Sequence, residues 1–207
     1  MKRLKTILQF INDKDIVADI GCDHGYLLKM AIKDKNILKG YAIDNKIGPL
    51  NSAKTNLYSF SNVEFILSDG LISVDKDDIN CVVIAGMGGM LINKIVEDSL
   101  SKFNKIKKII LCPNRNIDKV RSFFNEKGFM IVDEDIVYED GKYYEILVIE
   151  KGEQKLTDKE LFFGHTLLEK RTETFIAKWQ EYYDKIKNIE NKSDEIKLIE
   201  EVLYESE

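Results

Sequence analysis

Residues 16–28 read IVADIGCDHGYLL, and this stretch decides the fold that we predict. An apolar run typical of a buried strand ends in Asp19-Ile20-Gly21, three residues separate Gly21 from Gly25, and a helix-compatible segment follows. This order of strand, glycine-bearing turn and helix is typical of open parallel sheets that bind nucleotide-like ligands. Glycine permits a tight turn at Gly21 and close approach of a ligand to the backbone at Gly25. The spacing is not G-x-G-x-x-G, because positions 23 and 28 hold no glycine.

The composition predicts a soluble, cytoplasmic α/β protein. The 207 residues fit one full-size domain, or one domain with an appendage. The net charge of −5 excludes a global basic field, so any contact with nucleic acid must come from a local patch. Cys22, Cys81 and Cys112 lack C-x-x-C spacing, and histidine is scarce, which favours buried thiols over a disulfide or a metal site. We find no signal peptide and no membrane-spanning apolar run, so we expect no membrane association.

Further strand signals extend the predicted sheet. Short apolar runs stand at residues 40–44 (GYAID), 63–67 (VEFIL), 81–85 (CVVIA) and 108–112 (KIILC). An amphipathic helix at residues 1–11 is expected to dock on the sheet domain. The runs at 129–138 and 143–150 flank Glu139-Asp140-Gly141-Lys142, whose Asp-Gly pair predicts a hairpin. A mostly parallel sheet that ends in an antiparallel hairpin is the seven-stranded, Rossmann-like class I methyltransferase arrangement. We favour it over a six-stranded dehydrogenase sheet.

Two acids and a second glycine cluster follow these strands. Asp44 ends the second strand about twenty residues beyond Gly21, where a carboxylate accepts from both ribose hydroxyls in nucleoside-binding sheets; the alternative is a helix cap. Asp69 is either an ordinary Asp-Gly turn residue or an acceptor for an adenine amino group. The cluster Gly86-Met87-Gly88-Gly89-Met90 follows the fourth strand, and its methionines either line a site or fill the core. We predict that the turns after the first and fourth strands meet in one ligand-binding crevice.

A helical pattern replaces the strands after residue 152. Thr157 and Glu160 form a capping box at its start. Apolar residues then recur in steps of four and three from Leu161 to Ile189, which predicts a heptad seam, and a shorter helix follows. We therefore predict a sheet domain at 1–152 and an antiparallel coiled-coil hairpin at 153–207. Four residues of the seam are interpreted as hairpin core rather than as ligands: His165, Phe175, Trp179 and Tyr182.

Several of these motifs together resemble the TrmK family of bacterial tRNA methyltransferases. The matching segments are DIGCDHGYL (Asp19–Leu27), SDGL (Ser68–Leu71), VIAGMGG (Val83–Gly89), Pro113-Asn114 and EDGKYYEILV (Glu139–Val148). Members of this family methylate N1 of adenine 22 in the D-arm, and they join a seven-stranded methyltransferase domain to a C-terminal coiled-coil hairpin. The resemblance thus covers essentially the whole chain. Two positions depart from it: Cys112 stands where the family often has Gln, and Cys22 where it often has Ser or Thr.

The resemblance implies an S-adenosylmethionine-dependent tRNA (adenine-N1)-methyltransferase, with tRNA as its partner. We expect a monomer or weak dimer. It assigns the cofactor pocket to Asp19, Gly21, Asp23, His24, Gly25, Tyr26, Asp44, Asp69, Gly70, Ala85, Gly86 and Met87. Asp19 would face the cationic methionine end, Asp44 the ribose and Asp69 the adenine. His24 and Tyr26 either line the pocket or point into the core. Asn114 and Asp23 are the candidates near the transferred methyl group. The candidate RNA contacts are Lys2, Arg3, Asn114 and Arg115.

The implied reaction needs alignment more than it needs a base. N1 of adenine carries an in-plane lone pair, so it can attack a sulfonium methyl group without first losing a proton. Enzymes that act on exocyclic amino groups typically carry Asp/Asn-Pro-Pro-aromatic after the fourth strand, where Ala85-Gly86-Met87-Gly88 offers no side-chain acceptor. A base-paired target must also be unstacked before N1 is reached. Two other functions stay open on the same fold: a small-molecule methyltransferase, and a non-enzymatic RNA-binding adaptor.

Overall fold

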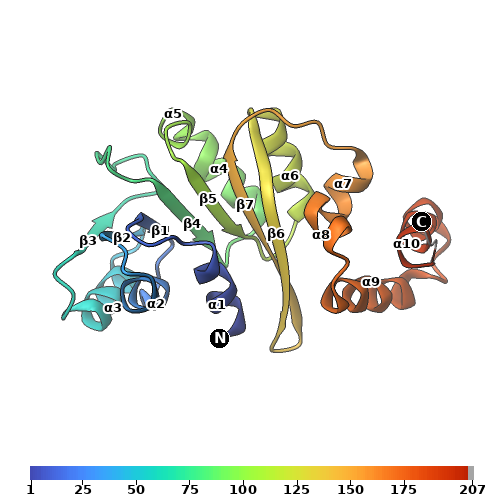
Figure 1. The fold of residues 1–207 in the computed structure, drawn as a ribbon, viewed down its shortest axis with the longest axis horizontal. Helices are drawn as coiled ribbons and strands as arrows, with labels where there is room; N and C mark the ends of the chain where they lie inside the picture. The colour runs from blue at the N-terminus through green and yellow to red at the C-terminus, as the bar shows by residue number, and fades with distance from the viewer. Residues whose placement is uncertain (205–207) are drawn as a thin grey trace.

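A seven-stranded sheet forms the centre of the computed structural model, which describes residues 1–204 (Figure 1). The strand order is β3-β2-β1-β4-β5-β7-β6. The bounds are β1 Ile16–Ile20, β2 Lys39–Asp44, β3 Val63–Leu67, β4 Cys81–Ala85, β5 Lys108–Cys112, β6 Phe129–Glu139 and β7 Lys142–Lys151. Strands β1 to β5 pair in parallel, whereas β7 runs antiparallel to β5 and to β6. The predicted sheet and its closing hairpin are therefore confirmed.

Helices cover both faces of this sheet. Their bounds are α1 Lys2–Gln9, α2 Tyr26–Lys35, α3 Ile47–Leu57, α4 Gly89–Glu97, α5 Leu100–Phe103 and α6 Ile117–Glu126. Buried side chains of α1, α2 and α3 pack with Val83 in one core cluster, and those of α4, α5 and α6 pack with Val82 in another. Successive residues of a strand point to opposite faces. Both faces of the central strands are thus buried, which explains their uninterrupted apolar sequence.

The C-terminal helices lie beyond β6 at one edge of the sheet (Figure 1). They are α7 Asp158–Phe163, α8 His165–Lys170, α9 Glu173–Ile186, a 3-10 turn at Glu190–Lys192 and α10 Ser193–Tyr204. The predicted capping box is present at Thr157. Helices α9 and α10 form the predicted hairpin, in which the Tyr183 hydroxyl donates to Glu200 over 2.8 Å. Phe175 and Trp179 are buried in its core, and Tyr182 packs against them, as predicted.

The prediction of one continuous seam from Leu161 to Ile189 is wrong. The chain breaks at Gly164, whose φ is +98°, and again at Arg171, whose φ is +42°. Thr172 then caps α9 by accepting from the N–H of Phe175. His165 begins α8, where its Nδ1 lies 3.0 Å from Glu160, so it is a structural residue that is held by a carboxylate rather than by an apolar seam.

A buried ionic cluster attaches these helices to the sheet. The guanidinium of Arg121 in α6 is fully buried, at 2.7 Å from Glu134 in β6 and 2.5 Å from Glu145 in β7. It also donates to the carbonyl oxygens of Leu161 and Phe162, the last turn of α7. Glu145 pairs in addition with Lys178 of α9. The sheet and the helices that follow residue 152 therefore share one buried polar network.

The cysteines match the sequence analysis, because Cys22, Cys81 and Cys112 are free and buried. Within residues 1–204, no helix combines the length and apolar character needed to cross a membrane. The same residues contain no group of three His, Cys, Asp or Glu side chains placed to hold a metal ion.

Candidate functional site

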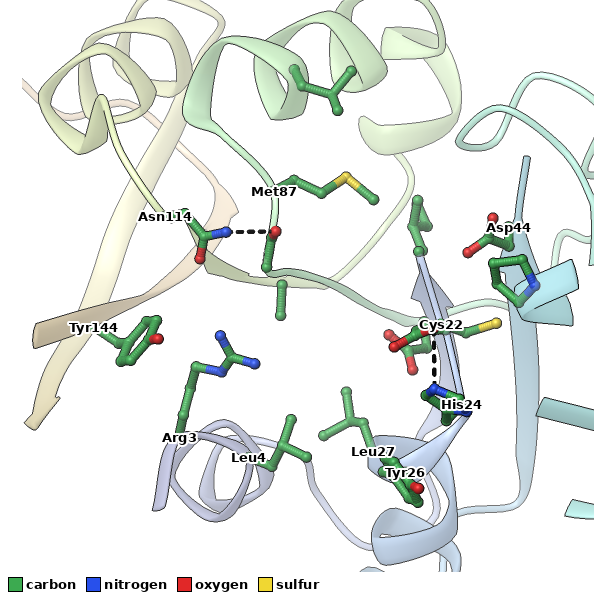
Figure 2. Close-up of a pocket in the computed structure, with 18 of the residues that line it drawn as sticks. Arg3, Leu4, Cys22, His24, Tyr26, Leu27, Asp44, Met87, Asn114 and Tyr144 are labelled. Carbon is green, nitrogen blue, oxygen red and sulfur yellow. Dashed lines mark hydrogen bonds and ion pairs between the residues drawn. The ribbon is translucent and has the colours of Figure 1, made fainter. Parts of the chain in front are cut away.

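The carboxyl ends of the parallel strands open into a cavity of about 1020 Å³ (Figure 2). Strand β1 lies between β2 and β4, so the strand order reverses there. Ligands of open α/β sheets bind at such a reversal. The ends of β1, β2, β4 and β5 contribute to the lining, together with the first turn of α1, the turn between β6 and β7, and helix α9. The predicted crevice is therefore present, and it reaches further than the two glycine turns.

The first glycine corner leaves β1 at Gly21. Its φ is +75°, and its N–H donates to the carbonyl of Ile43 over 2.8 Å, which ties the corner to β2. A Cβ at Gly21 would collide with the terminal methyl group of Met87. At Gly25, where φ is +68°, a Cβ would lie 2.6 Å from Cδ1 of Leu57. The contact between Gly21 and Met87 confirms that the two glycine corners meet in space.

The second corner follows β4 and is fastened by Asn114. Gly86 has a φ of +81° and donates its N–H to the carbonyl of Cys112. The side-chain amide of Asn114 donates to the carbonyl of Gly86 over 2.6 Å, and its backbone N–H donates to the carbonyl of Met87 over 2.8 Å. Asn114 therefore fixes the corner with its two N–H groups, and its Oδ1 is left as a hydrogen-bond acceptor. Figure 2 shows this contact at the top of the cavity.

Three carboxylates lie at the carboxyl ends of β1, β2 and β3 and line the cavity. Asp19 at the end of β1 is buried, and loss of hydration, together with the charges of Asp44 and Asp23, raises its pKa to about 7. Asp44 accepts from the N–H of Lys46 over 2.9 Å, so it holds the turn before α3 while it also lines the cavity. Asp69 lines the same cavity after β3. A cavity with this many acids favours a ligand that presents cations and hydrogen-bond donors.

His24 and Tyr26 lie on the rim of the cavity rather than in the core. Both side chains are about half exposed, and their rings lie 5.5 Å apart. Asp23 stands beside them, 3.7 Å from Nε2 of His24, with 71% of its side chain exposed. Of the two alternatives for His24 and Tyr26, the structure thus supports the pocket-lining one.

Most residues that the sequence assigned to the site line this cavity. They are Asp19, Gly21, Asp23, His24, Tyr26, Asp44, Asp69, Gly70, Ala85, Gly86, Met87, Asn114 and Arg3. Three others lie outside the lining: Gly25 packs against Leu57 of α3, Lys2 is exposed at the start of α1, and Arg115 packs beside Gly88. Of the two methionines, Met87 lines the cavity, whereas Met90 is 61% exposed.

Sequence reasoning missed the side of the cavity formed by β7 and α9. Tyr143 and Tyr144 at the start of β7, and Glu181 and Lys185 on α9, all line it. The guanidinium of Arg3 lies 4.8 Å from the centre of the Tyr144 ring. One signal was available: the first residues of an antiparallel closing strand lie at the same edge as the last residues of the parallel strands.

Comparison with known proteins identifies close likenesses over the whole chain. A model of the TrmK family, tRNA (adenine(22)-N(1))-methyltransferase, matches residues 17–205. The tRNA (adenine(22)-N(1))-methyltransferase of Bacillus subtilis is 32% identical over 187 residues, which cover 86% of this chain and 79% of that protein.

Two solved structures are similar in fold. A Streptococcus pneumoniae protein, a candidate tRNA (m1A22) methyltransferase in complex with S-adenosyl-L-methionine, is 34% identical, covers 99% of both chains and gives a TM-score of 0.93. The M. capricolum TrmK structure, in complex with S-adenosyl-homocysteine, is 26% identical, covers 98% of this chain and 97% of that one, and gives a TM-score of 0.77.

Proposed function

The chain belongs to the TrmK family of tRNA (adenine(22)-N(1))-methyltransferases, and we propose that its cavity binds S-adenosylmethionine on one side and an extruded adenine on the other. The family's reaction is methyl transfer from S-adenosylmethionine to N1 of adenine 22 in tRNA. The residue assignments rest on one observation. The two glycine corners meet where Gly21 contacts Met87, and this contact lies at the reversal of strand order.

The lining of the cavity fits S-adenosylmethionine. The ligand's ammonium group would be held by Asp19. Burial removes the hydration of this carboxylate, so a neighbouring cation would stabilise its ionised form. The two ribose hydroxyls would donate to Asp44, and the adenine amino group to Asp69. Gly21 and Gly86 leave the backbone open where a Cβ would narrow the cavity or strain the turn. When bound, the cofactor supplies a methyl group activated by a positively charged sulfur.

We assign the orientation of the target base to Asn114. Because its amide N–H is already donated to Gly86, its Oδ1 can accept from the exocyclic amino group of the target adenine. That contact turns the neighbouring N1 lone pair toward the methyl group and holds it in line. The Oδ1 dipole also offsets the positive charge that develops on the ring as N1 is alkylated.

Asp23, the second candidate, is assigned to the rim of the site. Its exposure places it in water, where a carboxylate contributes less to charge stabilisation than a fixed dipole inside the cavity. No base is required, because N1 of adenine attacks through a lone pair and carries no proton. We therefore propose Asn114 as the catalytic residue and Asp23 as part of the cofactor entrance.

The tRNA would approach the edge of the sheet where α1, the β6–β7 turn and α9 surround the cavity. Lys2, Arg3 and Arg115 are the proposed basic contacts, and the C-terminal helices are proposed to touch the tRNA from the side of α9. An adenine in a base-paired arm must leave the stack to enter the cavity. We propose that the protein acts in the cytoplasm as a monomer or weak dimer.

Methyl transfer to tRNA tests this function directly. The protein is incubated with unfractionated tRNA and S-adenosylmethionine that is labelled in the methyl group, and the tRNA is digested to nucleosides. We expect label in N1-methyladenosine, and loss of that label when adenine 22 of a tRNA transcript is replaced by guanine. Label in small molecules, or none at all despite binding of the cofactor by calorimetry, would refute the proposal in favour of a small-molecule enzyme or an adaptor.

A further inference from the structure

The turn between β6 and β7 forms a wall of the cavity, and none of its residues is among the proposed contacts of the cofactor or the target base. Asp140 and Gly141 both have positive φ, of +51° and +77°, which closes a tight hairpin. Because β7 starts at Lys142 and runs antiparallel to β5, its first residues lie level with the carboxyl ends of the parallel strands. The side chain of Tyr144 thereby reaches the cavity.

Arg3 lies against this tyrosine. Its guanidinium stands 4.8 Å from the centre of the Tyr144 ring, and its Nε is buried without a hydrogen-bond partner in the described part of the chain. The carboxylate of Glu139, at the end of β6, accepts from the backbone N–H of Lys2. That bond fastens the start of α1 to the hairpin and keeps Arg3 beside Tyr144.

The pair lies apart from the residues proposed to hold the cofactor. Figure 2 shows Tyr144 and Arg3 on one side of the cavity and Asp44 and His24 on the other, with Met87 between them. A methyl group passes between two ligands that meet, so a cofactor on the Asp44 side leaves the Tyr144 side for the base.

We propose that Tyr144, with Arg3 stacked on it, is the platform against which the target adenine stacks when it leaves the tRNA. The proposal rests on the function proposed above. Aromatic rings and guanidinium planes are the side chains on which splayed-out bases stack. The reaction itself adds a reason for an aromatic ring: methylation at N1 makes the adenine cationic, and the face of an aromatic ring attracts a cation. The ring, rather than the phenolic hydroxyl, is the part that acts.

Four variants of the full-length protein test the platform. Tyr144→Phe keeps the ring and removes the hydroxyl, whereas Tyr144→Leu removes the ring. Arg3→Gln removes the guanidinium, and Lys5→Gln is its matched control, because Lys5 is exposed on the same helix outside the cavity lining. For each, kcat/KM is measured with a tRNA transcript, and the Kd for S-adenosylmethionine is measured by calorimetry. Unchanged cofactor affinity shows that the variant has folded.

We expect Tyr144→Leu to lower kcat/KM for tRNA by about 5- to 150-fold, the usual range for losing one base–aromatic stack. Tyr144→Phe should lose much less than Tyr144→Leu, and Arg3→Gln should lose more than Lys5→Gln. The Kd for S-adenosylmethionine should stay the same in all four variants.

Three results would overturn the platform: full activity in Tyr144→Leu, equal losses in Tyr144→Phe and Tyr144→Leu, or a loss of cofactor affinity that accounts for the loss of activity. A parent protein that methylates no tRNA would instead refute the proposed function, and the platform with it. An active parent with an unimpaired Tyr144→Leu variant refutes the platform alone.

Discussion

Affinity for S-adenosylmethionine should depend on pH through Asp19. Loss of hydration at the buried end of β1, and then the charges of Asp44 and Asp23, raise the pKa of this carboxyl group to about 7. A neutral Asp19 gives the cofactor's ammonium group no opposite charge, whereas an ionised one does. Binding should therefore strengthen as the pH rises through 7.

The pKa of about 7 also gives the size of the effect. The ionised fraction of a carboxyl group changes from about one-tenth to about nine-tenths between one pH unit below its pKa and one unit above it. If only the ionised form binds, the Kd should be about tenfold larger near pH 6 than near pH 8, a difference of ~1.4 kcal/mol in binding free energy. Binding near pH 6 should release close to one proton, which calorimetry in buffers of different ionisation enthalpy measures.

Two controls separate Asp19 from other titrating groups. Asp19→Asn should bind the cofactor weakly and with little dependence on pH. A ligand without the amino-acid part, 5′-methylthioadenosine, should bind the parent protein equally well at both pH values. The reasoning is refuted by a Kd for S-adenosylmethionine that does not change across this range, or by the same pH dependence for 5′-methylthioadenosine.

The raised pKa of Asp19 should make the stability of the cofactor-free protein depend on pH in the direction opposite to cofactor affinity. Between the ordinary carboxyl pKa of 3.8 and about 7, the folded state holds a proton on Asp19 that the unfolded state has lost. The contribution of Asp19 to the free energy of unfolding should therefore be fully present below the lower value and fall as the pH rises toward 7. Thermal unfolding of the parent and Asp19→Asn proteins across this window measures the difference.

Three further substitutions test the site and its frame. Asp44→Ala should weaken cofactor binding by about 10- to 100-fold, as expected for hydrogen bonds to a charged acceptor, and leave the protein folded; equal affinity in calorimetry would remove Asp44 from the ribose site. Arg121→Met should lower the free energy of unfolding by about 3–5 kcal/mol in urea titrations, because it leaves Glu134 buried without a cation and leaves Glu145 with Lys178 as its remaining partner. Gly164→Ala should destabilise by more than the ~1–2 kcal/mol of positive φ alone, since its Cβ would lie 2.6 Å from the Arg121 guanidinium; an unchanged urea midpoint would contradict the packing.

The glycine corners and the acids could be predicted because they follow from local sequence and one topological rule. A strand that ends in Asp19-Ile20-Gly21 must turn at its carboxyl end, and parallel strands share that end. The acid at Asp44 and the cluster after Ala85 therefore had to face the same edge. No knowledge of side-chain packing was needed to bring them together.

The break in the C-terminal seam could not be predicted from periodicity. Heptad spacing records which residues are apolar, and it does not record backbone angles. Gly164 stands at the break because the cluster of Arg121 and Glu134 occupies the space where a side chain would lie. That cluster joins segments more than thirty positions apart in places, such as Glu134 and the N–H of Thr166, so no local window contains it.

Tyr144 and α9 were missed for a related reason. Their place in the site depends on the register of β7 against β5 and on ion pairs across the fold. Successive side chains of β7 point to opposite faces, so Tyr144 meets α1 on one face while Glu145 meets Arg121 and Lys178 on the other. Sequence alone could place both residues on a strand, but not name their partners.

This alternation along β7 bears on how the C-terminal helices take part in the reaction. Glu145 holds α9 through Lys178, and α9 contributes Glu181 and Lys185 to the cavity that Tyr144 also lines. A displacement of α9 by bound tRNA would thus act on the residue next to the proposed stacking platform. Helix α9 is therefore part of the cavity wall, because its Lys178 pairs with Glu145 of β7 while its Glu181 and Lys185 line the cavity.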